Sequence, residues 1–266
     1  MEQVAADISA NILLSKSIFR MELYAPSIAA KVVPGQFVMV RTSEDGCDPL
    51  LRRPFSVHNT TSAGEVHIVY KVLGKGTQLM SRMAAGGTVD LVGPLGKGFA
   101  LEDTEHFIVG GGMGIAPMQL LTDKIVDRYG KEKVHLLLGA RNKDELCAFQ
   151  GYYSAKVALD VQLATDDGSL AHKGFVTDLL REAGEQYGAG RRMVYCCGPQ
   201  PMMKAVASLS RKYGWRCQIS LETMMACGIA ACLGCTVEST RQNSKGGNYL
   251  HVCQDGPVFN EEDITW

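Results

Sequence analysis

The sequence predicts a protein of mixed architecture, with an antiparallel β-barrel in residues 1–101, a doubly wound parallel α/β sheet in residues 102–220 and a small C-terminal subdomain in residues 221–266. Three observations predict this division. The first hundred residues hold short alternating segments separated by glycine and proline turns, as in small barrels. After residue 105, short apolar segments alternate with helical ones. After residue 221 this alternation gives way to a loop rich in Gly, Ala and Cys.

Length and charge limit the possible classes of protein. The 266 residues suffice for two compact domains and an appendage. A net charge of −1 provides no basic surface for nucleic acid or an anionic membrane. The first nine residues include Glu2 and Asp7 and do not resemble a secretion signal, and no apolar run is long enough to span a bilayer. We therefore expect a cytoplasmic protein with no nucleic-acid or membrane partner.

The expected elements follow in chain order. In the barrel region, strands are expected at 36–40 and 65–70, and a helix is expected from Thr77, whose hydroxyl can cap it, to residue 83. In the sheet region, the expected strands are 107–109, 134–138, 161–164 and 193–196, and the expected helices are 118–129, 176–182 and 201–213. In the tail, strands are expected at 236–238 and 249–252, with a polar turn over 239–248.

Four of the nine cysteines gather near the C-terminus, with the spacing C-x4-C-x2-C-x17-C. An odd total and the absence of an export signal argue against a disulfide framework. The spacing is that of plant-type two-iron, two-sulfur proteins. A structural zinc site is the alternative, although zinc sites more often use two separated C-x2-C pairs. The sequence therefore predicts a [2Fe-2S] cluster held by Cys227, Cys232, Cys235 and Cys253.

Two motifs in the barrel region indicate a bound flavin. The first is Arg53, Pro54, Phe55 and Ser56, where the arginine fork can hold a phosphate while the serine reaches a flavin ring. A surface salt-bridge arginine beside a core aromatic is the alternative. The second is 74–77, which contains Gly76 and Thr77 and precedes the expected helix, so that main-chain N–H groups can bind a pyrophosphate. An ordinary glycine turn capped by Thr77 is the alternative.

A glycine-rich loop at 110–117 follows an expected strand and opens an expected helix, which is the context of a phosphate-binding loop. Gly112 and Gly114 are expected to let the main chain approach a nucleotide phosphate. A tight strand-to-helix connection is the alternative. Further along, Cys197, Gly198 and Pro199 end a strand where such sheets bind ligands, so Cys196 or Cys197 could lie near a nicotinamide. A small buried thiol is the alternative for either cysteine.

Together these motifs resemble the ferredoxin–NADP reductase superfamily. Its R-x-[Y/F]-[S/T], G-x-x-[S/T], G-x-G-x-x-P and C-G-P motifs match residues 53–56, 74–77, 112–117 and 197–199, in that order. The segments 221–228 and 253–259 and the cysteine loop resemble the electron-transfer subunit of the NAD-linked, two-subunit dihydroorotate dehydrogenase. Segments 165–169 and 173–177 resemble the same subunit. Phe55 departs from the Tyr common in the superfamily, and Ala230 stands where such subunits often have Gly.

The resemblance implies three cofactors and a partner. FAD would lie on the barrel, the cluster would lie in the cysteine loop, and NAD+ would accept a hydride from FAD. An FMN-containing dihydroorotate dehydrogenase subunit would supply the electrons for pyrimidine biosynthesis, in a heterotetramer with two copies of each chain. The chain alone would not oxidise dihydroorotate, and the loop 223–235 would lie at the partner contact. The residues implied to contact FAD are Arg53, Ser56, Val69, Tyr70, Lys71, Gly76 and Thr77.

Three questions stay open at this level. A diaphorase-type subunit of a hydrogenase, or of a bifurcating NADH/ferredoxin–NADP oxidoreductase, would have the same layout. A zinc-stabilised binding module without redox chemistry is an alternative of another class. The choice of NAD over NADP rests on the family likeness, because no acidic residue directly follows the second strand and Arg141 could accept a 2′-phosphate. Ile229, Ala230 and Leu233 are expected either to be covered by the partner or to pack on the barrel.

Overall fold

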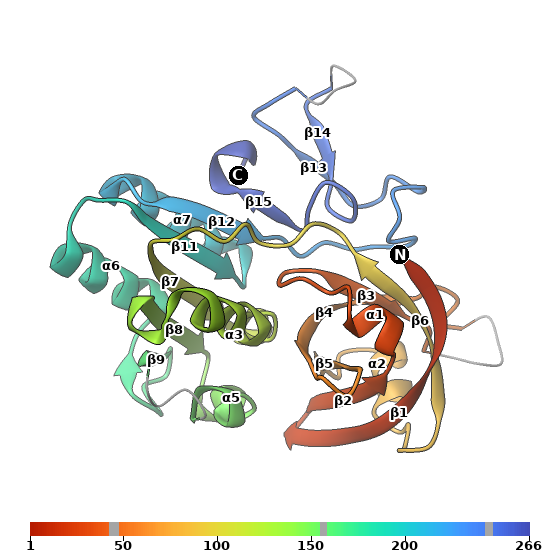
Figure 1. Cartoon of the computed structure of the whole chain (residues 1–266). Coiled ribbons are helices and arrows are strands. Elements are labelled where there is room, and N and C mark those ends of the chain that lie inside the picture. The colour runs from red at the N-terminus through yellow and green to blue at the C-terminus, as the bar shows by residue number, and fades with distance from the viewer. Residues whose placement is uncertain (43–47, 155–158, 243–246) are drawn as a thin grey trace.

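A computed structural model describes residues 1–42, 48–154, 159–242 and 247–266 of the chain (Figure 1). The barrel and the parallel sheet lie side by side, and the C-terminal segment runs along one end of both. Part of the expected polar turn at 239–248 lies outside the described residues. Among the described residues, no helix is both long enough and apolar enough to cross a membrane.

The N-terminal unit is a closed antiparallel barrel with the strand order β1-β2-β5-β4-β3-β6. Alternate residues point inward, so that Met21 and Leu23 of β2 and Ile68 of β5 form its core. The predicted barrel is confirmed. Its strands are β1 (Glu2–Ser15), β2 (Ile18–Tyr24), β3 (Phe37–Val40), β4 (Arg53–Thr60), β5 (Glu65–Lys71) and β6 (Thr88–Leu95), and α1 (Pro26–Ala29) covers one end.

The expected helix after residue 77 is displaced. Helix α2 (Lys75–Met80) begins two residues earlier, directly after the extended Gly74. The Thr77 hydroxyl lies inside the first turn of this helix. It accepts hydrogen bonds from the main-chain N–H groups of Leu73 and Gly74, with N···O distances of 2.9 and 3.2 Å. The prediction that Thr77 precedes and caps the helix was therefore wrong: Thr77 is the third helical residue, and its hydroxyl reaches back to N–H groups that lie before the helix.

The second unit is a seven-stranded sheet with the order β10-β9-β8-β7-β11-β12-β15, parallel except for the last strand. The order reverses beside β7, because β8 pairs on one side of it and β11 on the other. Such a reversal opens a crevice at the carboxyl ends of the strands. The strands are β7 (Glu105–Gly111), β8 (Val134–Ala140), β9 (Asp160–Thr165), β10 (His172–Lys173), β11 (Arg192–Cys197), β12 (Arg216–Ser220) and β15 (Val258–Asn260).

Helices cover both faces of this sheet, which confirms the doubly wound prediction. On one face, α3 (Met118–Tyr129) packs with the short helices α4 (Lys143–Cys147) and α5 (Gln150–Ser154). On the other face lie α6 (Val176–Tyr187) and α7 (Gln200–Tyr213). Helix α6 continues five residues beyond its expected end, to Gly188, whose positive φ of 65° stops it. The 3-10 turns are η1 (Gly112–Ile115), η2 (Lys131–Lys133) and η3 (Glu261–Asp263).

The C-terminal segment is integrated with the sheet unit. Its hairpin of β13 (Thr236–Glu238) and β14 (Tyr249–His251) stands apart, but β15 pairs antiparallel with β12. Cys253, Phe259 and Ile264 belong to the same apolar core as Val194 of β11. The cysteine loop is thereby anchored to the sheet, and the domain limits 1–101, 102–220 and 221–266 stay a prediction.

Several polar contacts fasten the barrel to the sheet unit. The ring of His58 on β4 donates through Nδ1 to the carbonyl of Ala116, at 2.6 Å. The Ser15 hydroxyl donates to the carbonyl of Asp144, at 2.6 Å. The Lys71 ammonium on β5 meets the Glu145 carboxylate on α4, at 2.7 Å. These contacts hold α4 and the loop after β7, near the carboxyl ends of the sheet strands, against β1, β4 and β5.

Candidate functional site

The four predicted cysteine ligands lie together in two pairs. Cys235 and Cys253 place their sulfurs 3.3 Å apart, and the thiol of Cys232 hydrogen-bonds to that of Cys227. The N–H of Ala230 links the pairs by donating to the sulfur of Cys253, at 3.1 Å. Thiols that meet in this way, within a loop that points several N–H groups at sulfur, fit an iron–sulfur cluster.

Main-chain donors also tune the sulfur of Cys227. Burial opposes ionisation, but the N–H groups of Ile229, Cys232 and Ala231 donate to this sulfur and lower the pKa of Cys227 to about 7. By contrast, burial raises the pKa of Cys253 to about 12, and the adjacent Cys235 adds to this effect. The loop therefore favours the thiolate form of Cys227, while Cys253 requires a bound cation to hold a negative charge.

The loop backbone is tightly wound. Ala230 and Leu233 have positive φ angles of 60° and 59°, which residues other than glycine rarely adopt. This explains why glycine would suit position 230, and it shows that the chain accepts strain there in order to direct the N–H of Ala230 at sulfur. Gly228 has a φ of 73°, and a Cβ there would lie 2.7 Å from Cγ of Met39.

The contact of Gly228 with Met39 places the cluster loop against the barrel. Met39 lies on β3, opposite Pro54 of β4, in the strand pair that carries the predicted flavin motif. The cysteine loop and the flavin motif are therefore separated by a single strand. Apolar side chains of the same loop face solvent: Met224, Ile229 and Leu233 are 90%, 49% and 58% exposed.

Arg53 and Gly76 of the predicted flavin site are neighbours. A Cβ at Gly76 would lie 3.5 Å from Nε of Arg53 and 3.2 Å from the hydroxyl of Thr42. The Thr42 hydroxyl is buried and has no hydrogen-bond partner among the described residues. A buried hydroxyl, an arginine and the first turn of α2 thus converge on one point, which fits a phosphate group. Sequence reasoning missed Thr42, which carries no motif signal.

The other residues predicted to contact FAD differ in whether their side chains or their main chains can reach a ligand. Ser56 and Phe55 lie half-buried on β4. The Tyr70 ring packs inside the barrel and its hydroxyl donates to Asn11, so only its main chain is free to meet a ligand. Val69 packs into the core of the sheet unit, and Lys71 reaches the cleft between the two units.

A cleft of about 610 Å³ opens between the barrel and the carboxyl ends of the sheet strands. Its walls include Lys71 from the barrel, Gly112 from the glycine loop and Pro199 from the end of β11. Gly112 has a φ of 55°, and a Cβ there would meet nothing within 4 Å. The main chain at Gly112 therefore borders open space, as a phosphate-binding loop must.

Gly114 has a different structural role. A Cβ there would lie 2.4 Å from the carbonyl carbon of Cys197 and 2.5 Å from the nitrogen of Gly198. Gly114 therefore lets the glycine loop touch the end of β11, and it does not line the cleft. Gly114 was expected to let the main chain approach a phosphate, but the close approach that it permits is to the main chain of Cys197 and Gly198.

Cys197 of the C-G-P motif and the preceding Cys196 are both buried. Cys196 lies in the core on one face of the sheet, and Cys197 lies on the other. Burial raises the pKa of Cys197, and the negative charge of Glu222 adds to this. Glu222 is exposed, and partial desolvation raises its pKa. Glu222, which sequence reasoning missed, thus faces the same region as Cys197.

The far end of the cleft carries a carboxylate. Asp166 follows β9 and lies beside Arg141, which follows β8, because those parallel strands are paired in register up to Ala140 and Thr165. Burial raises the pKa of Asp166 and Arg141 opposes this, so the two charges interact. Phe175 is 62% exposed at the start of α6 and lines the same wall.

Family models match three consecutive parts of the chain. They are the oxidoreductase FAD-binding domain over residues 5–99, the oxidoreductase NAD-binding domain over residues 108–208, and the iron-sulfur cluster binding domain of dihydroorotate dehydrogenase B over residues 222–265. The predicted cofactors, FAD, NAD and an iron–sulfur cluster, are thereby confirmed.

Similar proteins extend over almost the whole chain. The dihydroorotate dehydrogenase B (NAD(+)) electron transfer subunit of Desulforamulus reducens is 35% identical over 98% of this chain and 97% of that one. The subunit of the same name from Caldanaerobacter subterraneus is 40% identical over 88% of this chain and 87% of its own. The structure of an NADH-dependent reduced ferredoxin-NADP oxidoreductase superposes with a TM-score of 0.84 and 29% identity, covering 99% and 90% of the two chains. The chain therefore belongs to the family of dihydroorotate dehydrogenase B electron transfer subunits.

Proposed function

We propose that this chain carries electrons from a dihydroorotate-oxidising partner subunit to NAD+, through a [2Fe-2S] cluster and FAD, in cytoplasmic pyrimidine biosynthesis. The observation that carries the proposal is the contact of Gly228 in the cysteine loop with Met39, the strand neighbour of Pro54. A cluster in this loop and a flavin on β4 would lie close together. Such closeness serves a protein that passes electrons between two centres.

The cofactors supply the redox chemistry when bound, since the cluster handles single electrons and FAD couples them to hydride transfer. The residues bind and orient these groups. Arg53, Thr42 and the first turn of α2 would hold the FAD phosphates. Ser56 on β4 would face the flavin ring, and the N–H groups of the cysteine loop would stabilise the negative charge on sulfur.

The nucleotide would bind in the cleft between barrel and sheet. Gly112 would leave its phosphates room to approach the main chain, and Pro199 would border the nicotinamide end. Asp166 would accept hydrogen bonds from the adenosine ribose and repel a 2′-phosphate, which favours NAD over NADP. Phe175 offers an exposed ring on which an adenine can stack.

The partner would cover the exposed apolar side chains of the cysteine loop. Met224, Ile229 and Leu233 lie within ten residues of each other and surround the ligands Cys227 and Cys232. A group of exposed apolar side chains on a protein surface often marks the contact site of a partner protein. An FMN-containing catalytic subunit on this surface would bring its flavin near the cluster, and a heterotetramer would contain two copies of each chain.

The test is to assay the chain loaded with FAD and cluster. Alone, it should oxidise NADH with an artificial acceptor and should not oxidise dihydroorotate. Dihydroorotate oxidation coupled to NAD+ should appear when the catalytic subunit is added. Turnover of dihydroorotate by this chain alone would contradict the proposed division of labour. Failure of the catalytic subunit to bind would favour the bifurcating alternative, whose solved example shares the fold.

A further inference from the structure

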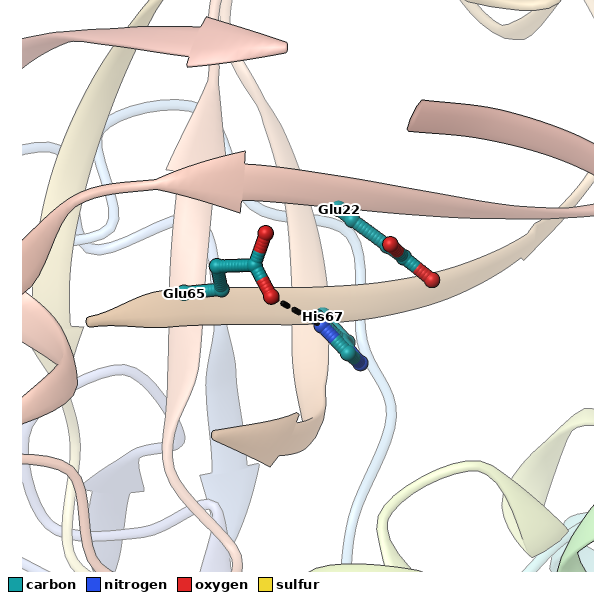
Figure 2. Close-up of side chains that lie close together, drawn as sticks. All are labelled: Glu22, Glu65 and His67. Atoms are coloured by element: carbon teal, nitrogen blue, oxygen red, sulfur yellow. Dashed lines mark hydrogen bonds and ion pairs between the residues drawn. The ribbon is translucent and has the colours of Figure 1, made fainter. Parts of the chain in front are cut away.

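Three side chains of metal-ligand type lie close together on the outer face of the barrel (Figure 2). Glu22 comes from β2, and Glu65 and His67 come from β5. Their ligand atoms all lie within 4.8 Å of one another. Nε2 of His67 lies 3.4 Å from Oε2 of Glu65. None of these three residues lines the cleft or belongs to the cysteine loop.

Strand pairing holds the three side chains together. Glu22 lies directly opposite His67 in the antiparallel pair β2–β5, so both project from the same face. Glu65 lies two residues before His67 and therefore shares that face. The three side chains are only 17%, 23% and 13% exposed, for Glu22, Glu65 and His67 in that order. Rigid strands thus fix a ligand set that is largely withdrawn from water.

The charges in this group are not balanced. Arg20 pairs with Oε1 of Glu22 at 2.7 Å. Glu65 is held by hydroxyl donors, since Ser9 and Thr61 both hydrogen-bond to it. The hydrogen bond from Ser9 lowers the pKa of Glu65 most, and the bond with His67 adds to it, so that this carboxyl stays ionised. Two carboxylates and one guanidinium leave one negative charge uncompensated beside an imidazole.

We propose that Glu22, Glu65 and His67 bind a divalent cation of the zinc class, with water completing the coordination. An imidazole nitrogen together with carboxylate oxygens suits zinc better than magnesium or calcium. In a tetrahedral site with bonds of about 2.0–2.2 Å, neighbouring ligand atoms are about 3.3–3.6 Å apart, which agrees with the spacing of His67 and Glu65. Arg20, Ser9 and Thr61 would orient the carboxylates as outer partners.

The cation would link β2 to β5 on the face that meets the sheet unit. Ile18 and Val69, further along the same two strands, pack into the core of that unit. His58 on the neighbouring strand is neutral, because burial lowers its pKa to about 4, so it adds no repelling charge. The site would thus brace the strand pair that carries Lys71 into the cleft.

The test uses the protein loaded with FAD and cluster, treated with EDTA and titrated with zinc chloride. Zinc and iron per chain are then measured by elemental analysis after gel filtration. We expect one bound zinc with unchanged iron, and at least tenfold weaker zinc binding in His67→Gln and Glu65→Gln. His172→Gln is the matched control, since His172 faces one carboxylate, Asp178, at 3.9 Å. It should bind zinc like the wild type.

Three results would overturn the proposal. They are the absence of saturable zinc binding, equal zinc binding by His67→Gln and the wild type, and zinc uptake that is matched by loss of iron. The last result would assign the zinc to the cysteines. Flavin absorbance and the unfolding midpoint of each variant establish that it is folded, and Glu65→Gln keeps the side-chain size.

Discussion

Replacing Arg53 by alanine tests the flavin site most directly. Arg53 and Arg52 are adjacent in sequence, but their surroundings differ. Arg52 donates through Nε to the Asp90 carboxylate at 2.8 Å, on the strand β6. Arg53 lies beside Gly76 and the unpartnered hydroxyl of Thr42. Arg53→Ala should therefore weaken FAD binding, and Arg52→Ala should leave FAD binding nearly unchanged.

The magnitude follows from the kind of contact. A hydrogen bond between a guanidinium and a phosphate is charge-assisted and contributes about 1.5–3 kcal/mol. The FAD dissociation constant of Arg53→Ala should accordingly rise roughly 10- to 150-fold. Thr42→Val gives a second measure: loss of a neutral hydrogen bond to FAD costs about 0.5–1.5 kcal/mol of binding. In the flavin-free protein the same change should raise stability, because it removes a buried hydroxyl without a partner.

The assay is titration of the flavin-free protein with FAD, followed by quenching of flavin fluorescence, with the cluster absorbance as a check on folding. Arg53→Ala should retain its cluster and lose FAD affinity. An unchanged dissociation constant in this variant would refute the phosphate assignment. An equal loss in Arg52→Ala would refute it as well, because the effect would then come from barrel stability.

Four further predictions concern the other sites. Cys232→Ser should lower iron and sulfide per chain, because a cluster ligand is lost. Gly112→Ala should raise the KM for NADH about tenfold without affecting bound FAD. The added methyl group occupies space at the cleft, and alanine disfavours the positive φ of this position. Asp166→Ser should raise kcat/KM with NADPH roughly 10- to 100-fold, because it removes a charge that repels a 2′-phosphate. His106 is buried, neither of its nitrogens has a partner among the described residues, and burial lowers its pKa to about 4. Because unfolded histidine takes up a proton below pH ~6.5, the folded state loses stability as pH falls from there toward 4, and His106→Phe should remove about 2 kcal/mol of the loss between pH 7 and pH 5.

The first three of these predictions have matched control variants. Cys147→Ser alters an exposed free cysteine and should keep the full cluster. Gly86→Ala also changes an unobstructed glycine of positive φ, but outside the cleft, so an equal rise in KM would count against Gly112. Asp167 is bound to Ser169, and Asp167→Ser should not alter the nucleotide preference. For His106→Phe, the free energy of unfolding is measured with urea at pH 7 and at pH 5. If the variant loses as much stability between these two pH values as the wild type does, the proton-linkage argument is contradicted.

Much of the architecture could be predicted because its signals are local. The spacing of Cys227, Cys232 and Cys235 lies within one loop, and the structure does bring these residues together with Cys253. Helix α3 and strand β13 have the predicted limits, because apolar periodicity and flanking turns define them. The start of α2 was misplaced because a threonine hydroxyl suits two positions, the residue before a helix and the third residue within it, and the sequence does not distinguish them.

The remaining features depend on contacts between distant segments. Thr42 is a single residue without a motif, and its meaning arises only where β3 ends beside Arg53 and α2. The acidic residue of the nucleotide site was sought after the second strand of the sheet unit, whereas Asp166, the residue that we propose for this role, follows the third strand and lines the cleft. Pairing of β8 with β9 brings that carboxylate to Arg141. A sequence pattern cannot reveal such a pairing, because strand order is set by the packing of the whole sheet.

The position of the cysteine loop explains why its supporting residues are spread over the chain. The loop contacts Met39 on the barrel through Gly228, while β15 ties the segment after Cys253 to the edge of the sheet. The cluster ligands thus bridge both units, and any movement of barrel against sheet would strain them. The contacts of His58 with Ala116 and of Lys71 with Glu145 oppose that movement at the opposite end of the interface. Because electron transfer and hydride transfer both require fixed spacing, the two sets of contacts serve the same purpose, and loosening either set should impair both transfers together.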